Sequence, residues 1–440
     1  MSSTLGLQGL ERLPVGVSRP DYDFEGLGVG ILHLGLGAFH RAHQAMFTED
    51  AIREAGGDWG IVGAAFRHSA TPDALARQDH LYTVETLSEM PEYRIIAALK
   101  SSLTAATQPA QLRAKFQDPK IHIVTMTVTE KGYCLDQNGD LDLAHDDIAH
   151  DLVEPSAPAS AIGTLALGLA QRCQVGGTPV TVISCDNLRE NGSKLERAIM
   201  AFMARTRPEV LPWLRSNVRF PQSMVDCIVP ASSDASRLRV SHRIGLSDAA
   251  SVQREPYSQW VIEDTFAGPR PRWDHVGTQI VKDLADYARL KLHVLNACHS
   301  ALAYLGLARG FALVREAVAD AALSRFLDEL VELEIGPALS PLGVDYYWSV
   351  VRRRFQNRHI DHRLAQIAED GQQKLSQRVF PLMIINLRSG APIARLAQIV
   401  RAWLKFKHMD MNAALEDASL IPRAIAGSPV ARAAILSGVA

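Results

Sequence analysis

Three polar side chains in the C-terminal half of the chain have the types and spacing for proton transfer and oxyanion stabilisation. Lys291, Asn296 and His299 lie in the apolar stretch LKLHVLNACHSALAYLG. At about 100° per residue, an α-helix would place them within an arc of roughly 140°. A lysine whose pKa falls through desolvation is a general base for an alcohol, and an asparagine amide can donate to the developing alkoxide. The spacing alone equally fits an amphipathic helix with a hydrogen-bonded core histidine.

Two further polar groups follow or interrupt apolar runs in the N-terminal half. Asn187 comes directly after Asp186 in SCDN, at the end of the run from Pro179 to Cys185. Ligands of open α/β sheets bind at the carboxyl ends of strands, although Asp and Asn also favour helix caps. Asp226, in FPQSMVDCIVP, is either a turn former or a polar group that reaches a cleft.

A glycine-rich turn follows the first apolar run, Gly28 to Leu34. Gly35 and Gly37 permit a tight turn and a close approach of a pyrophosphate to backbone N–H groups at a helix N-terminus. His40 replaces the third glycine of the GxGxxG pattern, and Arg41 is either a phosphate contact or a surface charge. An ordinary strand-to-helix turn has the same composition, but the place of this turn in a βαβ unit favours dinucleotide binding.

The preference for NAD or NADP is open from the sequence. A carboxylate about 20 residues after the turn would bind the adenosine ribose of NAD. Here the second apolar run, Gly60 to Phe66, ends in Arg67, His68 and Ser69. NAD is the expected cofactor, and NADP is not excluded.

The order of the apolar runs predicts an α/β fold with two domains. Strands are expected at 28–34, 60–66, 93–99, 121–128 and 179–185, and helix-like stretches lie between them, which indicates a doubly wound, mostly parallel sheet with helices on both faces. The aspartate-rich segment 136–151 fits a solvated loop better than a calcium site, because it lacks the EF-hand spacing. From 283 the chain is rich in Ala, Leu, Arg and Glu. Residues 1–282 are therefore expected to bind the dinucleotide, and residues 283–440 to form a mainly α-helical domain.

Composition narrows the function classes. Apolar residues make up 47% of the 440 residues and charged residues 21%, which is typical of a globular protein. A net charge of −2 gives no general attraction to nucleic acid or to an anionic membrane. The five cysteines form no CxxC pair, so no metal site is expected. With no secretory signal pattern and no long apolar stretch, we expect a cytoplasmic protein in a reducing compartment.

Several blocks of the sequence resemble the polyol-specific long-chain dehydrogenases and reductases. The blocks GLGAFHRAHQA, QDHLYTV, TVTEKGY, SCDNLRENG, FPQSMVD, EPYSQWVIEDTF and KLHVLNACHSALAYLG occur in the order found in that family. This resemblance covers residues 28–405 approximately. It outweighs the purely structural interpretations of these residues as an amphipathic helix, a helix cap and an ordinary turn. It implies a Rossmann-type domain, a helical domain and metal-independent hydride transfer in a cleft between them.

The resemblance also implies roles for individual residues. Lys291 would be the general base of alcohol oxidation and the acid of ketone reduction, Asn187 and Asn296 would stabilise the oxyanion, and His299 would orient substrate hydroxyls. Asp226 would contact the polyol chain. The dinucleotide would be held by Gly35, Gly37, Phe39, His40 and Arg41.

One segment inclines the expected substrate towards a sugar acid. HRLAQIAEDGQQKLSQR resembles the fructuronate reductases (D-mannonate oxidoreductases) of the family more than its mannitol 2-dehydrogenases. A uronate carboxylate needs a charge-assisted hydrogen bond, which Lys374 or Arg378 would supply, with Arg363 a weaker candidate. An ordinary basic surface helix fits these residues as well. The expected reaction interconverts D-mannonate and D-fructuronate, and the alternative is a neutral polyol such as mannitol or arabinitol.

Four positions depart from the family pattern. Cys227 and His293 stand where arginine is common, and Ala297 stands where glycine is common. Ala288 replaces a glutamate linked to proton exchange with solvent, which makes His293 a candidate for that exchange. The resemblance favours a monomer.

Two other kinds of function would explain fewer of the candidate residues. A non-catalytic sensor of NAD redox state would not need all four catalytic-type side chains. A zinc-dependent alcohol dehydrogenase would need cysteine partners for His40 and His43, and the sequence offers none near them.

Overall fold

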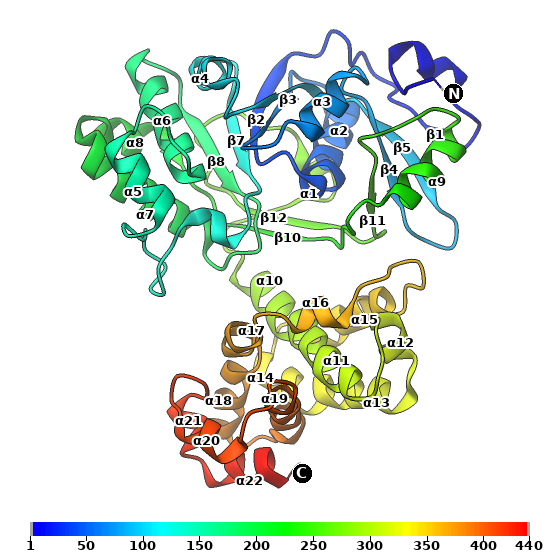
Figure 1. Ribbon diagram of the computed structural model, residues 1–440, viewed down its shortest axis with the longest axis vertical. Helices are drawn as coiled ribbons and strands as arrows, with labels where there is room; N and C mark the ends of the chain where they lie inside the picture. The colour runs from blue at the N-terminus through cyan, green and yellow to red at the C-terminus, as the bar shows by residue number, and fades with distance from the viewer. Residues whose placement is uncertain (1–2, 438–440) are drawn as a thin grey trace. The chain divides into compact units, whose positions relative to one another are not determined.

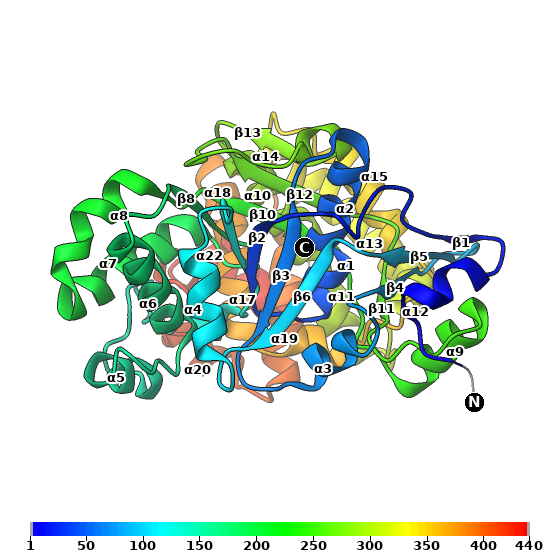
Figure 2. The same ribbon diagram turned by 90° about the horizontal axis from the view of Figure 1, so that it is seen from above.

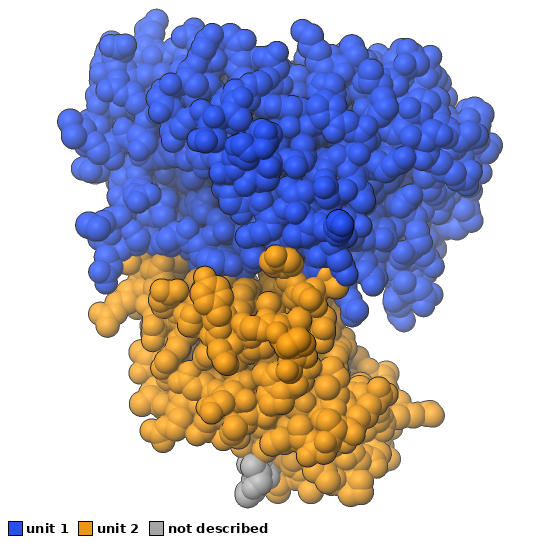
Figure 3. Space-filling view, turned by 180° about the vertical axis from the view of Figure 1, so that it is seen from behind, with its two compact units in different colours: residues 1–284 blue, residues 285–440 orange. Residues whose placement is uncertain are grey.

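The computed structural model describes residues 3–437, which fold into two compact units (Figure 3). Unit 1 comprises Met1–Leu284 and unit 2 comprises Ala285–Ala440. No helix among residues 3–437 is both long and apolar enough to cross a bilayer.

A six-stranded parallel sheet forms the centre of unit 1 (Figure 2). Its order is β6-β3-β2-β7-β8-β9, which numbers the strands 3-2-1-4-5-6 in chain order, the Rossmann arrangement. The strands are β2 (Val29–Leu34), β3 (Gly60–Ala65), β6 (Leu99–Thr104), β7 (Ile123–Met126), β8 (Val180–Ser184) and β9 (Val218–Arg219). The prediction of a doubly wound, Rossmann-type fold is confirmed.

Helices cover both faces of this sheet because successive strand side chains point in opposite directions. On β2, Leu32 and Leu34 pack in a core with α4 (Pro109–Gln117), α6 (Ala161–Gln174) and α7 (Asn191–Thr206). Ile31 points the other way, into a core with α2 (Gln44–Ala55). The central strand β2 is therefore buried on two sides, which explains its nearly continuous apolar run.

Two smaller sheets complete unit 1. One has the order β1-β5-β4-β11 and the other β10-β12-β13. Their strands are β1 (Val17–Ser18), β4 (Tyr82–Thr86), β5 (Glu92–Ile96), β11 (Val252–Arg254), β10 (Ser223–Asp226), β12 (Gln259–Glu263) and β13 (Gln279–Val281). The remaining α-helices of more than five residues are α3 (Ala70–Ala76), α5 (Asp146–Val153), α8 (Leu211–Asn217) and α9 (Asp234–Ile244).

The prediction of a single strand over residues 93–99 is wrong. The chain leaves the small sheet after β5 and enters the central sheet at β6, so the apolar run belongs to two sheets. The buried carboxylate of Glu49 accepts hydrogen bonds from the N–H groups of Ala97 (3.0 Å) and Ala98 (2.7 Å), which lie between the two strands. This tertiary contact is invisible in the local pattern.

The aspartate-rich segment is only partly a loop. Asp136 accepts hydrogen bonds from the N–H groups of Asn138 and Asp140 in a tight turn. The second half forms α5 (Asp146–Val153), where Asp146 and Asp147 complement the positive end of the helix dipole. No group of three or more potential metal-binding side chains occurs in the described part of the chain.

Unit 2 is helical, as predicted (Figure 1). Its central helix, α11 (Ala297–Ala308), is apolar on nearly all sides and packs against α12, α13, α16, α17 and α19. The surrounding helices are α10 (Ala285–Leu290), α12 (Val314–Ala319), α13 (Ala321–Leu330), α14 (Gly336–Leu339), α15 (Val344–Phe355), α16 (Leu364–Ala368), α17 (Gly371–Arg378), α18 (Phe380–Ser389), α19 (Ala394–Phe406), α20 (Met411–Glu416), α21 (Arg423–Ala426) and α22 (Pro429–Ser437).

Candidate active site

The glycine turn of unit 1 lies where the strand order of the central sheet reverses, between β2 and β7. Gly35 has φ +95°, and a Cβ there would lie 2.1 Å from the carbonyl oxygen of Thr127. Gly37 has an extended backbone, and a Cβ there would meet only the Gly35 oxygen, at 3.7 Å. Gly35 is therefore required by the fold itself, whereas Gly37 leaves free space directly before α1 (Ala38–Ala42). Such space at the switch point fits a dinucleotide pyrophosphate.

Stacked aromatic rings support this turn. His40 on α1 stacks on His33 of β2, with 3.4 Å between ring centroids, and Phe39 stacks on His43 at 5.0 Å. Burial lowers the pKa of His33 to about 3 and that of His40 well below its usual value. Neither ring nitrogen of His40 has a hydrogen-bond partner among the described residues. His40 therefore supports the turn as a neutral ring, and its contact with a cofactor stays a prediction.

Arg41 is largely engaged by the protein. Its Nε donates to the carbonyl of Gly37 (3.2 Å) and its Nη1 to the carbonyl of Ala250, while Tyr82 Oη donates to the Arg41 carbonyl (2.9 Å). These bonds tie the turn to its neighbours in unit 1. A contact of Arg41 with a phosphate stays a prediction.

Asn187 stands exposed at the carboxyl end of β8, next to a buried network. The Asp186 carboxylate accepts hydrogen bonds from the N–H groups of Val128 and Thr129, both at 2.9 Å, and from Tyr133 Oη at 2.8 Å. Burial raises the pKa of Asp186, and these bonds oppose that shift. Asp186 thus fixes the loop after β7 and the position of its neighbour Asn187.

Asn191 is a positioning residue that sequence reasoning missed. Its Nδ2 donates to the carbonyls of Ser184 (3.1 Å) and Ser223 (2.9 Å), and its Oδ1 accepts from the Ser223 N–H. The side chain joins the end of β8 to β10, whose last residue is the buried Asp226. A second asparagine in SCDNLREN was the available signal, but nothing in the sequence showed its partners.

In unit 2, Lys291 and Asn296 lie at the two ends of a π-helical segment, Lys291–Asn296, that continues directly into α11. A π-helix closes i→i+5 hydrogen bonds, so these two residues are separated by about one turn and share a face. The α-helical spacing assumed from the sequence is therefore wrong here, although its conclusion of a common face holds. Lys291 is 8% exposed and Asn296 half-buried.

His299 lies on the first turn of α11 among aromatic and basic groups. Its ring contacts those of Phe355 (4.6 Å between centroids) and His362 (5.2 Å). Burial lowers the pKa of His299 well below its usual value, and the nearby His362, Arg354, Arg378 and Lys291 lower it further. The imidazole is therefore neutral at pH 7 in a basic surrounding.

Arg378 and Lys374, the two residues expected to bind a carboxylate, lie on α17. Arg378 Nη1 donates to the Asn296 carbonyl (3.4 Å) and to Ser300 Oγ (3.3 Å), and the Arg378 carbonyl accepts from His293 Nδ1 (3.1 Å). Arg378 thus braces the π-helical segment. Lys374 Nζ donates to the Ile367 carbonyl at 3.2 Å. Arg363 lies exposed before α16.

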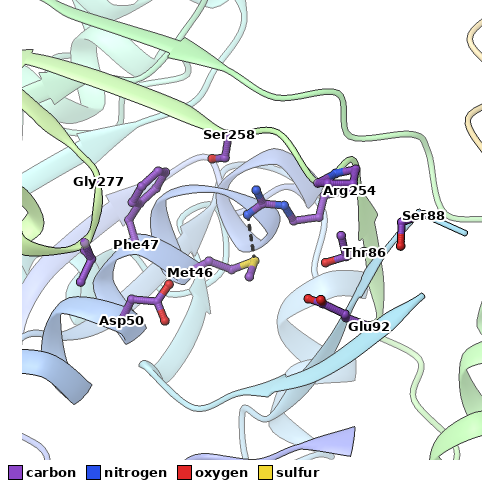
Figure 4. A pocket seen from close by; sticks show the side chains of 11 residues that line it. Met46, Phe47, Asp50, Thr86, Ser88, Glu92, Arg254, Ser258 and Gly277 are labelled. Carbon is purple, nitrogen blue, oxygen red and sulfur yellow. Dashed lines mark hydrogen bonds between the residues drawn. The ribbon is translucent and has the colours of Figure 1, made fainter. Parts of the chain in front are cut away.

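Unit 1 also has a recess of about 470 Å³ (Figure 4). Its polar lining includes Asp50, Glu92 and Arg254, and it contains none of the predicted site residues. Arg254 Nη1 donates to the Ala42 carbonyl (3.2 Å) and contacts Met46 Sδ, so it supports the α1–α2 junction.

Comparisons with known proteins give the family. A model of the mannitol dehydrogenase Rossmann domain matches residues 29–275, and one of the mannitol dehydrogenase C-terminal domain matches residues 283–419. The chain belongs to the mannitol dehydrogenase family. It is an oxidoreductase of this family, as the sequence resemblance predicted.

Relatives within the mannitol dehydrogenase family differ in substrate. D-mannonate oxidoreductase of Escherichia coli is 39% identical over 399 residues, which cover 89% of this chain and 82% of that protein. Mannitol 2-dehydrogenase of Phaeosphaeria nodorum is 35% identical over 401 residues, covering 89% and 71%. The solved ternary complex of Pseudomonas fluorescens mannitol 2-dehydrogenase with NAD and D-mannitol superimposes with a TM-score of 0.88 at 32% identity, covering 99% and 96%.

Proposed function

We propose that this oxidoreductase transfers hydride between NAD(H) and a pair of a sugar acid and a ketose acid, D-mannonate and D-fructuronate. The observation that carries the proposal is the basic character of the site in unit 2. Two arginines, Arg354 and Arg378, lie close enough to His299 to lower its pKa. A carboxylate substrate would complement this charge, whereas a neutral polyol would not.

NAD is the proposed cofactor. The Rossmann strand order and the open space at Gly37 fit a dinucleotide, and the Pseudomonas fluorescens relative was solved with NAD. Arg67, the residue that would favour the 2′-phosphate of NADP, forms an ion pair with Asp147 at 3.0 Å. When bound, NAD supplies the nicotinamide carbon that accepts the hydride.

The side chains of this chain would perform the proton chemistry. Neutral Lys291 would accept the proton of the substrate hydroxyl through Nζ during oxidation and return it during reduction. The amides of Asn187 and Asn296 would donate to the developing alkoxide oxygen. The proposal requires both amides to reach the same oxygen.

Two further side chains would hold the substrate. Neutral His299 would bind a substrate hydroxyl, and the carboxylate of Asp226 would accept a hydrogen bond from another. Lys374 remains the proposed partner of the substrate carboxylate. The bonds of Arg378 to the Asn296 carbonyl and to Ser300 favour a positioning role for that residue.

A substrate screen tests the proposal. We expect the purified chain to oxidise D-mannonate with NAD faster than D-altronate, D-mannitol, D-arabinitol or D-sorbitol, followed by absorbance of NADH at about 340 nm. A clear preference for mannitol would overturn the sugar-acid assignment. Binding of NAD without turnover of any of these compounds would support a redox sensor instead.

The second candidate is a neutral polyol dehydrogenase with the same catalytic residues. Its support is the structural similarity to the mannitol 2-dehydrogenase that was solved with D-mannitol. In either case we propose a monomer in a reducing, cytoplasmic compartment, with which the five free thiols agree.

A further inference from the structure

A second histidine lies beside His299 in unit 2. The ring of His362 meets the ring of His299 edge to face, with 5.2 Å between centroids and 80° between planes. His362 belongs to the block that resembles fructuronate reductases, but the sequence gave it no role. Phe355 also packs on the His299 ring, with 4.6 Å between centroids.

Each imidazole has a buried nitrogen without a partner. Among the described residues, neither Nε2 of His299 nor Nδ1 of His362 has a hydrogen bond. His299 is 92% buried, since its exposed fraction is 8%. A buried polar atom left without a partner costs about 1–3 kcal/mol, so two such atoms on touching rings call for a ligand that completes them.

The backbone around His362 is fixed by the protein. The Val314 N–H donates to the His362 carbonyl at 3.0 Å, and the Leu364 N–H donates to the Ala312 carbonyl at 2.9 Å. The two segments thus form a short antiparallel bridge between Leu313 and Arg363. A ring held on such a backbone is placed before the substrate arrives, which lowers the entropy cost of binding.

Charges around the pair favour an anion. Burial lowers the pKa of His362, and the neighbouring Lys374 lowers it further. Burial and the nearby Arg354 and Arg378 do the same to His299. Both rings are therefore neutral at pH 7, and each offers one N–H donor and one acceptor.

We propose that His362 binds the carboxylate of the sugar-acid substrate through Nδ1–H, while Nε2 of His299 binds an adjacent hydroxyl. Lys374 supplies the positive charge beside this carboxylate. The inference rests on the proposed function, because a neutral polyol has no carboxylate for His362 to recognise. It makes His362 a specificity-determining residue that discriminates a carboxylate from a hydroxymethyl group.

Three substitutions at one position test the assignment. We expect His362→Ala to lower kcat/KM for D-mannonate about 10- to 100-fold, the loss typical of one hydrogen bond to a charged group, mainly through KM. The same variant should change kcat/KM for D-mannitol no more than about 3-fold. His362→Asn places an amide near the position of Nδ1 and should recover most of the loss, whereas His362→Gln places it near Nε2 and should not.

His359→Ala is the matched control, because His359 is exposed on the same loop and should leave both substrates unaffected. Thermal unfolding of each variant shows whether it is folded. If wild-type protein oxidises mannonate but His362→Ala lowers both substrates equally, the His362 assignment is overturned and the proposed function stands. If wild-type protein prefers mannitol, the proposed function fails first and the inference fails with it. Equal behaviour of the Asn and Gln variants would contradict the role of Nδ1.

Discussion

The glycine turn of unit 1 and the π-helical segment of unit 2 both hold proposed site residues on an unusual backbone, but by different means. At Gly35, a positive φ and the nearby Thr127 carbonyl leave no room for a Cβ, so the backbone itself selects the residue. In the segment Lys291–Asn296, every residue has a side chain, and contacts from α17 hold the register. The first device is local and depends on sterics, whereas the second is tertiary and depends on partners.

The two regions also differ in how they use buried histidines. In unit 1, His33 and His40 stack on each other, and His33 is bonded to Thr125, Thr127 and the Gly35 carbonyl, so the pair supports the turn. In unit 2, His299 and His362 meet edge to face among basic groups. The first pair is built for stability and the second for a ligand.

The largest effect is expected at Lys291. Lys291→Met should lower kcat about 10²- to 10⁴-fold, because general acid–base catalysis contributes that much. NAD binding, measured by protein fluorescence, should remain, since the proposed cofactor residues belong to unit 1. Lys407→Met is the control, because Lys407 is exposed on unit 2. Retention of more than about a tenth of the activity in Lys291→Met would exclude Lys291 as the general base.

The same contrast explains what the sequence could predict. The alternation of strands and helices, the glycine turn and the helical second unit follow from apolar periodicity and from glycine placement, both of which are local signals. The register of Lys291 and Asn296 does not, because a π-helical turn has no local pattern that distinguishes it from an α-helix. The roles of Asn191 and Arg378 depend on partners 32 and 82 residues away. Such contacts exist only after folding.

The two glycines of the turn should have different roles, Gly35 in the stability of the fold and Gly37 in the binding of NAD. Gly35→Ala should lower the free energy of unfolding by about 1–3 kcal/mol through backbone strain, with more from the clash with Thr127. Gly37→Ala should leave stability nearly unchanged, because a Cβ there meets only one atom at 3.7 Å, but it should weaken NAD binding about tenfold or more. Urea unfolding and NAD titration measure the two quantities. Equal loss of stability in both variants would contradict the distinction.

The two basic residues of α17 should have separable effects. Lys374→Ala should lower kcat/KM for D-mannonate about tenfold and leave D-mannitol nearly unchanged, because it removes a charge-assisted contact. Arg378→Ala should lower kcat several-fold for both substrates, because it releases the Asn296 carbonyl and Ser300. Steady-state kinetics on both compounds checks this. A selective loss of mannonate activity in Arg378→Ala would instead make Arg378 the carboxylate partner.

Lowering the pH should destabilise the folded chain through the buried pair His33 and His40 of unit 1. Because burial lowers the pKa of His33 and His40, the folded chain binds fewer protons than the unfolded chain, and stability falls as the pH drops below about 6.5. Each histidine should account for about 1 kcal/mol between pH 6.5 and 5.5. His40→Phe keeps the stacked ring and should reduce this pH dependence, whereas a substitution of the exposed His68 should not. Urea unfolding at the two pH values provides the measurement.

The smallest effect is expected at His293, the candidate for proton exchange in a chain with Ala288 in place of the family glutamate. Its Nδ1 faces the Arg378 carbonyl, which only accepts a hydrogen bond, so Nδ1 carries the hydrogen of this ring. His293 also helps to hold the π-helical segment, so His293→Ala should lower kcat only a few-fold. The two roles differ in their response to added imidazole. Imidazole in solution can replace a missing proton carrier, but it cannot replace a missing structural contact. Recovery of kcat with imidazole concentration, together with an altered pH dependence of turnover, would assign proton exchange to His293. An unchanged pH dependence without recovery would mean that His293 has only a structural role, as a hydrogen-bond partner of Arg378 on α17.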